Sequence, residues 1–324
     1  MDFRSVLIIG GSGFIGGHLL AKLAGTDWRV IVVTRRYEKA RHLLELPSVD
    51  DLVEADIHDE ATLHRLMQGN TAVINLVGIL HSHPGSPYGP DFAKVHVELP
   101  RKVAAACAAN GVHRLLHMSA LGAAADAPSM YLRSKADGER AAMSQPSVGV
   151  TIFRPSVVFG DGDHFLNMFA ALEKFLPVML LASADAKFQP VYVEDVAQAF
   201  VHALSNDRTI GKTYELAGPT VYTLRELVKL AGVCSGHSRP VIGLPEPLAR
   251  LQAMLMEHMP GEPLMTRDNL DSMKIENVAS VAAEPIDPEL GITPTTLESV
   301  APYYLTGQRP PHTGVDATHT AARH

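Results

Sequence analysis

A tyrosine and a lysine four residues apart, Tyr131 and Lys135, form the only YxxxK pattern in the chain. On a helix this spacing places both side chains on one face. A lysine ammonium beside a phenol favours the phenolate and lowers the phenol pKa from about 10, so Tyr131 can exchange a proton with a carbonyl or an alcohol. Ser119 precedes Tyr131 at the end of a predicted strand, where its hydroxyl can polarise the same oxygen. The pattern predicts a proton-transfer site made of Ser119, Tyr131 and Lys135.

A glycine-rich segment near the N-terminus follows a short apolar run, residues 6–9 (VLII). Its spacing is GxxGxxG: the first glycine permits a tight turn, the second a close approach to a pyrophosphate, and the third close packing of the next helix on the strand. The start of that helix is a suitable site for an anion. The segment therefore predicts a dinucleotide site that includes Gly10, Ser12, Gly13, Phe14, Ile15 and Gly16. Tyr131 and Lys135 are expected to contact the cofactor as well, Lys135 at the nicotinamide ribose.

Two arginines, Arg35 and Arg36, follow the second predicted strand. A site for NAD(H) usually has an acidic residue there, which binds the ribose 2′-hydroxyl. Guanidinium groups match the charge and geometry of a 2′-phosphate. We therefore expect NADP(H) to be preferred over NAD(H); the alternative is a solvated basic loop.

Short β-branched runs alternate with helical patterns through the first half of the chain, as they do in parallel sheets with crossover helices. We expect strands at 5–10, 29–34, 52–55, 72–77, 114–118 and 149–153, and a return to the sheet at 212–216. The predicted fold is a Rossmann-type, doubly wound α/β domain over 1–160, with a return to the sheet at about 189–216. A smaller substrate or lid subdomain would take 161–188 and 217–305, and 306–324 would form a disordered tail.

Composition narrows the class of protein. The chain has 324 residues, 46% hydrophobic and 19% charged, which is typical of a globular protein. A net charge of −7 argues against nucleic-acid binding. Two cysteines, no apolar run of about 18 residues and a polar start favour a cytoplasmic protein, with peripheral attachment to the inner face of a membrane left open. His81 and His83 have no nearby partner ligands in the sequence, so no metal site is expected.

The motifs together resemble an extended short-chain dehydrogenase/reductase, in the atypical branch that contains the nucleotide-binding accessory subunit of mitochondrial complex I and its bacterial relatives. The resemblance rests on residues 73–78 (VINLVG), 130–135 (MYLRSK), 154–160 (RPSVVFG), 165–167 (FLN) and 189–196 (QPVYVEDV). It implies that Asp56 and Ile57 contact the adenine and that Pro155 and Val158 contact the nicotinamide amide. The rest of the cofactor would be lined by Asn75, Leu76, Val77 and Gly78.

The sequence departs from the family pattern at several positions. His96 stands where many relatives have the asparagine of a catalytic tetrad, and Ser156, Phe159 and Gln189-Pro190 replace residues usual in sugar-nucleotide epimerases. These departures weaken the case for a sugar-nucleotide substrate. Asp195 is expected to cap the helix that begins beside it.

Three functions remain open from the sequence. The first is an NADP(H)-dependent oxidoreductase or epimerase that acts through Ser119, Tyr131 and Lys135 on a hydrophobic or quinone-linked carbonyl or alcohol. The second is a non-catalytic NADPH-binding assembly or structural protein of a respiratory NADH:quinone oxidoreductase, and the third is an NADPH redox sensor. A homodimer is a further expectation from the resemblance.

The segment 248–259 is rich in leucine and methionine. Such a helix can close over a lipid or isoprenoid tail. The alternative, which we favour from the sequence, is core packing of a C-terminal helix.

Overall fold

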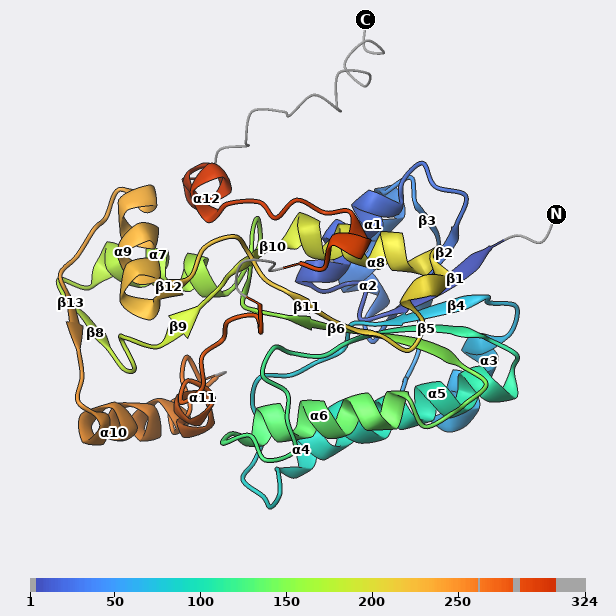
Figure 1. Ribbon diagram of the computed structural model, residues 1–324, viewed down its shortest axis with the longest axis horizontal. Coiled ribbons are helices and arrows are strands. Elements are labelled where there is room, and N and C mark those ends of the chain that lie inside the picture. The colour runs from blue at the N-terminus through green and yellow to red at the C-terminus, as the bar shows by residue number, and fades with distance from the viewer. Residues whose placement is uncertain (1–3, 262, 282–285, 307–324) are drawn as a thin grey trace, which may run out of the picture.

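Seven parallel strands form the central sheet of the computed structural model, which describes residues 4–261, 263–281 and 286–306 (Figure 1). The spatial order is β3-β2-β1-β4-β5-β6-β11, so the chain reverses direction across the sheet between β1 and β4. This order confirms the predicted Rossmann-type, doubly wound sheet. The strands are β1 (Ser5–Ile9), β2 (Arg29–Thr34), β3 (Val49–Glu54), β4 (Ala72–Asn75), β5 (Arg114–Met118), β6 (Gly149–Pro155) and β11 (Thr213–Leu216).

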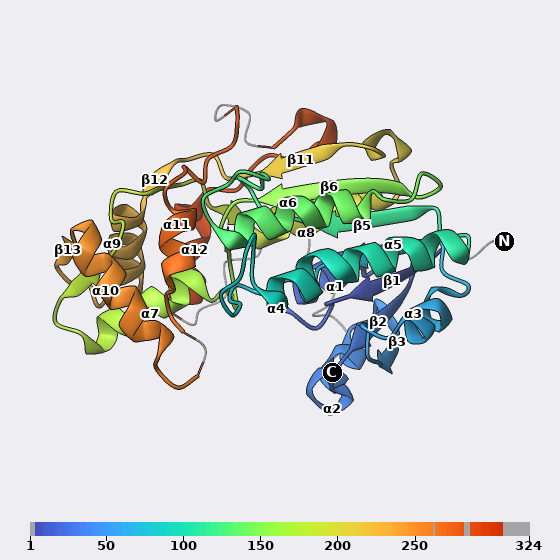
Figure 2. The same ribbon diagram turned by 90° about the horizontal axis from the view of Figure 1, so that it is seen from below.

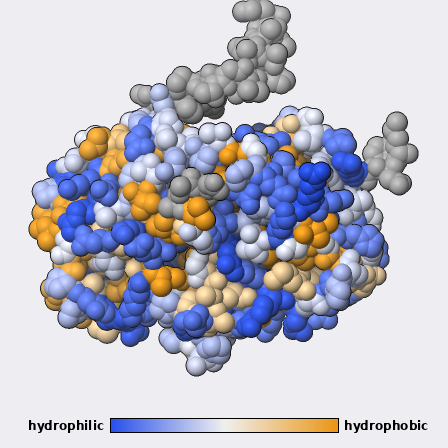
Figure 3. All heavy atoms as spheres, in the orientation of Figure 1, coloured by the Kyte–Doolittle hydropathy of each residue, from blue (hydrophilic) through white to orange (hydrophobic). Residues whose placement is uncertain are grey.

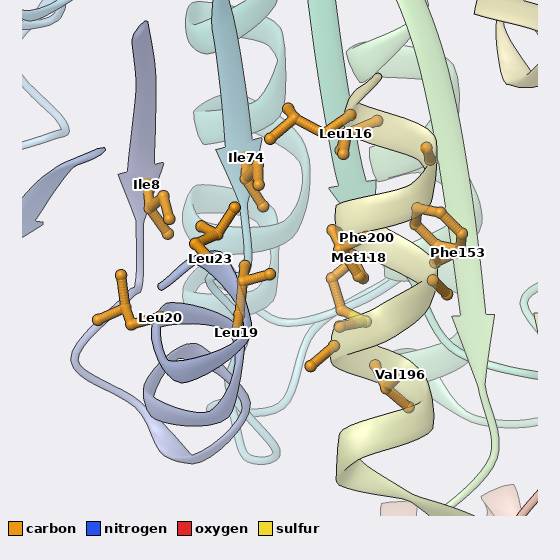
Figure 4. Packing of buried hydrophobic residues seen from close by; sticks show 14 of the residues in the cluster. Ile8, Leu19, Leu20, Leu23, Ile74, Leu116, Met118, Phe153, Val196 and Phe200 are labelled. Atoms are coloured by element: carbon orange, nitrogen blue, oxygen red, sulfur yellow. The ribbon is translucent and has the colours of Figure 1, made fainter. Parts of the chain in front are cut away.

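The central strands are apolar on both faces because helices cover both faces. On β1, Val6 and Ile8 pack toward one side while Leu7 and Ile9 pack toward the other. Helices α1 (Phe14–Leu23) and α8 (Val193–Leu204) cover the first side, where Figure 4 shows Leu19, Leu23 and Phe200 against the strands. The second side is covered by α3 (Glu60–Met67), α5 (Leu99–Ala109) and α6 (Met130–Ala142), as Figure 2 shows.

Local capping sets where the helices of the second side begin and end. The Asp59 carboxylate accepts a hydrogen bond of 2.8 Å from the Thr62 amide at the start of α3. The Ser129 hydroxyl accepts one of 3.2 Å from the Leu132 amide at the start of α6. After α5, Gly111 has a φ of +71°, which favours glycine and agrees with the predicted end of this helix. A short helix α4 (Pro90–Phe92) and a π-helix, Ala93–Glu98, lead into α5.

A second region lies beside the carboxyl ends of the strands and has its own core (Figure 1). Helices α7 (Phe165–Phe175), α9 (Leu224–Ser235) and α12 (Leu297–Leu305) surround that core. Three separate two-stranded pairs lie outside the central sheet: β7 (Val158–Phe159) with β10 (Val191–Tyr192), β9 (Lys187–Phe188) with β12 (Tyr222–Thr223), and β8 (Met179–Leu181) with β13 (Val241–Gly243), the last at the end of the molecule farthest from that sheet (Figure 1). The remaining helices are α2 (Tyr37–Ala40), α10 (Glu246–Glu257), α11 (Arg267–Ser272) and the 3-10 helices Arg41–Glu45, Asp207–Thr209 and Pro288–Leu290.

Two expectations from the sequence are wrong. The large residues of 248–259 do not pack in a core: α10 buries only Ala249 and Ala253 and exposes most of its leucines and methionines. The Asp195 carboxylate does not cap α8, because it accepts hydrogen bonds from the amide and hydroxyl of Thr295 at 2.7 and 3.0 Å. The predicted tail falls outside the described residues, apart from Thr306. Among the described helices, none is both long and apolar enough to span a membrane.

Candidate functional site

The turn between β1 and α1 has the geometry that a bound pyrophosphate requires. Gly10 has a φ of +86°, and Gly13 occupies the N-cap of α1 without a side-chain hydrogen bond to the first-turn amides. A methyl group on Gly16 would lie 2.3 Å from the Gly11 carbonyl oxygen, so no larger residue fits there. Ser12 and Gly13 are exposed, and Phe14 and Ile15 begin the helix. The uncapped amides at an exposed glycine turn fit the pyrophosphate of a dinucleotide.

A cavity of about 460 Å³ adjoins this turn at the end of β2. It is lined by Ser12, Thr34, Arg35, Arg36, Lys39 and Ala40. The three cationic side chains are exposed, and within the described residues none of them forms an ion pair. Two hydrogen bonds fix the backbone here: the Arg36 amide donates to the Thr34 hydroxyl at 3.2 Å, and the Tyr37 amide donates to Glu54 at 2.5 Å. The cavity therefore presents uncompensated positive charge.

Residues after β4 lie between the glycine turn and the predicted catalytic helix. Asn75 is buried; its oxygen accepts the Val77 amide at 3.2 Å, and its nitrogen lies 3.2 Å from Nδ1 of His117. A methyl group on Gly10 would lie 3.1 Å from the Val77 nitrogen, and one on Gly78 would lie 3.2 Å from Nζ of Lys135. The structure thus brings together the glycine turn, the segment from Asn75 through Leu76 to Gly78, and Lys135.

Tyr131 and Lys135 lie on α6 beside the carboxyl ends of β4 and β5. The Lys135 ammonium donates to the Met118 carbonyl at 3.2 Å and lies 6.0 Å from the centroid of the Tyr131 ring. Burial lowers the pKa of Lys135 to about 8, opposed by the nearby Glu139. Burial also raises the pKa of Tyr131 to about 12. Desolvation of the phenolate thus dominates the pKa of Tyr131 in this structure, and stabilisation of the phenolate by Lys135 stays a prediction.

Ser119 is buried at the end of β5, but its hydroxyl donates a hydrogen bond to Glu139, one turn beyond Lys135 on α6. Arg154 holds the same carboxylate through two hydrogen bonds of 2.7 and 2.6 Å. The described contacts thus place Ser119 in a network with Glu139 and Arg154 rather than on Tyr131. A polarising role for Ser119 stays a prediction. Glu139 continues the four-residue spacing of Tyr131 and Lys135, a signal that the sequence analysis missed.

His96 occupies the π-helix before α5 and joins the β4 loop to α6. Its Nε2 accepts the Ile79 amide at 3.1 Å, and its Nδ1 lies 2.8 Å from the Ser134 hydroxyl, which donates to the Tyr131 carbonyl at 2.7 Å. These contacts define a neutral ring with the proton on Nδ1. Burial, with lesser contributions from Lys135 and His117, lowers the pKa of His96 to about 2. His96 therefore fixes the position of α6 and carries no ionic charge.

Two further residues at the site carry no local sequence motif. Asp268 on α11 accepts hydrogen bonds from the amides of Met130 and Tyr131 at 2.7 and 3.0 Å. Its carboxylate therefore caps the helix that carries Tyr131, from more than a hundred residues away in the sequence. Asn277 accepts the Ser156 hydroxyl at 2.5 Å and the Val157 amide at 3.2 Å. We name residues 266–279, which carry both side chains, the strap.

The other predicted cofactor residues lie at two places. Pro155 ends β6 and Val158 begins β7, on either side of the residues that Asn277 holds. Asp56 and Ile57 follow β3, where the exposed Asp56 carboxylate accepts the His58 amide at 2.9 Å and Ile57 is buried. Contact of these four residues with a cofactor stays a prediction.

A larger cavity, of about 640 Å³, is lined in part by strap residues 273–276. Its lining mixes apolar residues, among them Leu244, Met273 and Ile275, with charged ones of both signs. Lys187 pairs with Glu276 and Arg225 pairs with Asp185. Ile275 connects this cavity to the predicted catalytic residues, because a methyl group on Gly122 in the loop before α6 would lie 2.9 Å from its Cδ1.

The chain is similar to two named proteins over most of its length and to a solved structure over nearly all of it. The mouse mitochondrial NADH dehydrogenase [ubiquinone] 1 alpha subcomplex subunit 9 is 33% identical over 298 residues, which cover 90% of this chain and 77% of the relative. Ceramide reductase of Caulobacter vibrioides is 31% identical over 253 residues, 76% of this chain and 75% of that protein. The structure of a UDP-glucose 4-epimerase from Bifidobacterium longum, in complex with NAD+ and UDP, has a TM-score of 0.69 at 17% identity, covering 94% and 97% of the two chains.

The family model that describes NAD dependent epimerases and dehydratases matches residues 6–217, which contain the glycine turn, the YxxxK pair and all seven strands of the sheet except the first residue of β1. The chain belongs to the NAD dependent epimerase/dehydratase family.

Proposed function

We propose that this protein is an NADP(H)-dependent oxidoreductase that acts on a carbonyl or alcohol of a hydrophobic molecule. The observation that carries the proposal is the buried Lys135 ammonium beside Tyr131, at the point where β4, β5 and α6 meet. A buried cation needs a function or a partner to offset its desolvation. Within the part of the chain that the structure describes, the Lys135 ammonium donates to a neutral carbonyl, and the nearby Glu139 offsets its desolvation only in part.

The side chains can move one proton at the substrate oxygen. When bound, the nicotinamide supplies the hydride that reduces a carbonyl carbon. Tyr131 is protonated well above neutral pH, so it acts as the acid that gives its proton to the developing alkoxide. The Lys135 ammonium then stabilises the phenolate, and this requires a charged lysine; turnover should fall as the pH rises through about 8.

We infer the preference for NADP(H) from the cationic cavity beside the glycine turn. Arg35 and Arg36 line it together with Lys39, and their charges are uncompensated among the described residues. Replacing both arginines (Arg35→Ala with Arg36→Ala) should weaken NADPH binding by about 10- to 100-fold and change NADH binding by less than about threefold, as measured by fluorescence titration. Arg41→Ala, an exposed arginine outside the cavity, is the control. Equal losses for both nucleotides would contradict the preference.

The hydrophobic substrate is supported by the apolar part of the cavity beside the strap, where Leu244, Met273 and Ile275 lie among charged residues of both signs. A relative that is 31% identical is named ceramide reductase, which suggests a lipid carbonyl for this chain as well. The test is the rate of NADPH oxidation with short, medium and long 2-alkanones. The rate should rise with chain length; reduction of short ketones alone, with no gain from length, would contradict a hydrophobic substrate.

A second candidate is a non-catalytic, NADPH-binding subunit of a respiratory complex. One observation favours it: the Ser119 hydroxyl donates its hydrogen bond to Glu139 and is therefore not directed at a substrate oxygen beside Tyr131. The relative from mouse is named as a subunit of a mitochondrial NADH dehydrogenase. Under this alternative, bound NADPH would persist in the presence of every ketone, and the protein would be found at the membrane with partner subunits.

A further inference from the structure

Glu139 lies one turn beyond Lys135 on α6, and both side chains reach the same end of β5. The Lys135 ammonium donates to the Met118 carbonyl at 3.2 Å, and the next residue, Ser119, donates its hydroxyl to Glu139. Because neighbouring Cα atoms are about 3.8 Å apart, the ammonium and the carboxylate lie side by side across the end of the strand. Many hydrophilic side chains lie at the surface, as Figure 3 shows for one face of the molecule, but Lys135 and Glu139 are only 4% and 5% exposed.

Arg154 does not neutralise Glu139 alone, because two carboxylates share its guanidinium. It donates to Glu139 through hydrogen bonds of 2.7 and 2.6 Å. Glu215 lies directly opposite Arg154 in the register of β6 and β11, and both acids raise the pKa of the guanidinium, Glu139 the more strongly. Ser280, which follows the strap, donates to Glu215 from its amide and hydroxyl at 2.6 and 2.9 Å. Two negative charges thus face one positive charge, and the Lys135 ammonium is the cation that completes the balance.

The other titratable neighbours of Lys135 are neutral. Burial, with a smaller contribution from Lys135, lowers the pKa of His96 on the π-helix to about 2 and the pKa of His117 on β5 to about 3. Tyr131 on α6 keeps its proton, because burial raises its pKa to about 12. Of the titratable groups that the described residues place around Lys135, Glu139 alone is an anion. Its carboxylate therefore opposes the desolvation that favours a neutral amine.

We propose that Glu139 is a positioning residue whose carboxylate keeps the Lys135 amine in its ammonium form during the reaction, an inference that rests on the proposed function. The ammonium stabilises the phenolate after Tyr131 has given up its proton, and a neutral amine would not do so. Glu139 acts through Lys135, because its own hydrogen bonds are with Ser119 and Arg154. The alternative is a purely structural ion pair that joins α6 to β6, in which case the charge of Lys135 does not depend on Glu139.

The first experiment titrates Lys135 by nuclear magnetic resonance in the full chain, with neither cofactor nor ketone added. The lysines are isotope-labelled at Cε, and the Lys135 signal is assigned by its loss in Lys135→Arg. In Glu139→Gln the midpoint of this titration should fall by at least about one pH unit, because the opposing charge is gone while the burial remains. Glu98→Gln is the matched control: it removes the same charge from an exposed position on the π-helix and should titrate as the original chain does. An unmoved midpoint in Glu139→Gln would overturn the proposal.

A second variant keeps the proposal testable if Glu139→Gln does not fold. Glu215 is only half-buried on β11, so Glu215→Gln should fold as the original chain does. Without Glu215, Arg154 offsets more of the charge of Glu139, and the midpoint of the Lys135 titration should fall by a few tenths of a pH unit. A midpoint that stays in place or rises in Glu215→Gln would contradict the sharing of Arg154 and, with it, the proposal.

The pH profile of ketone reduction separates the charge of Glu139 from its structural contacts. Lys135 has a pKa of about 8, so a midpoint about one pH unit lower should reduce turnover of Glu139→Gln about fivefold at pH 8 and less than about 1.5-fold at pH 6. Glu139→Asp, which retains the charge, should keep the profile of the original chain. Equal losses at both pH values would mean a structural role and would overturn the proposal.

The two measurements also distinguish this proposal from the proposed function. If the Lys135 titration shifts in Glu139→Gln but no ketone is reduced by the original chain, the effect of Glu139 on Lys135 stands and the oxidoreductase fails. If ketones are reduced but the Lys135 titration does not move, the oxidoreductase stands and the role of Glu139 fails.

Discussion

The glycine turn and the strap contact opposite ends of the predicted site, and they are built in different ways. At the turn, backbone meets backbone: Gly16 has the Gly11 carbonyl oxygen where a methyl group would be, and Gly10 lies against the Val77 nitrogen. In the strap, two side chains bind segments that are distant in the sequence. Asp268 accepts hydrogen bonds from two amides at the start of α6, and Asn277 accepts them from a hydroxyl and an amide that follow β6. The turn depends on the absence of side chains and the strap depends on two particular ones, so substitutions should affect them differently.

The largest effect is expected at Gly16. Gly16→Ala would place a methyl group 2.3 Å from the Gly11 oxygen, which forces α1 away from β1 and disrupts the turn for the pyrophosphate. NADPH binding should weaken by more than about 100-fold, as measured by fluorescence titration, and the protein should lose stability by about 1–3 kcal/mol. Gly17→Ala is the control, because a methyl group there has no neighbour within 4 Å. Similar losses in both variants would refute the role of close packing.

A smaller effect is expected at Asp268. Asp268→Ala leaves two amides at the start of α6 without an acceptor, so the first turn that carries Tyr131 should become less ordered. Turnover should fall about tenfold with NADPH affinity nearly unchanged, and Asp268→Asn, which can still accept from one amide, should be intermediate. Asp126→Ala, an exposed residue in the preceding loop, should behave as the original chain. An unchanged kcat in Asp268→Ala would show that the strap does not position Tyr131 for turnover.

The smallest effect is expected in the second core, at Glu173. Its carboxyl oxygens are buried and lie where a methyl group on Gly232 would be, and Arg239, whose guanidinium donates to the Glu173 carbonyl at 2.9 Å, offsets the desolvation of the carboxylate only in part. Burial raises the pKa of Glu173 to about 7, so its contribution to stability is full below about pH 4.5 and is lost as the pH rises through about 7. Glu173→Gln should gain about 1 kcal/mol over the original chain at pH 8.5 and little at pH 5 in denaturant unfolding. If the unfolding free energies of the two proteins differed by the same amount at pH 5 and at pH 8.5, the raised pKa of Glu173 would be contradicted.

The strands of the sheet could be predicted from the sequence because each is marked by a short run of neighbouring apolar, β-branched residues. Each expected strand has a counterpart, and Gly111 ends α5 where expected. The strap was missed because Asp268 and Asn277 act over tertiary distances, and neither lies in a recognisable motif. The environment of Tyr131 was also missed, since the spacing of two residues cannot report how strongly the surrounding fold desolvates a half-buried phenol. The exposure of α10 reversed our interpretation because periodicity identifies an apolar face without showing what covers it.

The central claim is that Tyr131 gives a proton to a carbonyl while NADPH is bound, and one variant tests it most directly. The original chain and Tyr131→Phe are each loaded with NADPH, and the cofactor fluorescence is followed after a long-chain ketone is added. Both should bind NADPH with the same affinity within about threefold, and only the original chain should lose fluorescence, at least about 100-fold faster than the variant. Equal decay in the two proteins, or none in either across the whole ketone series, would contradict the account.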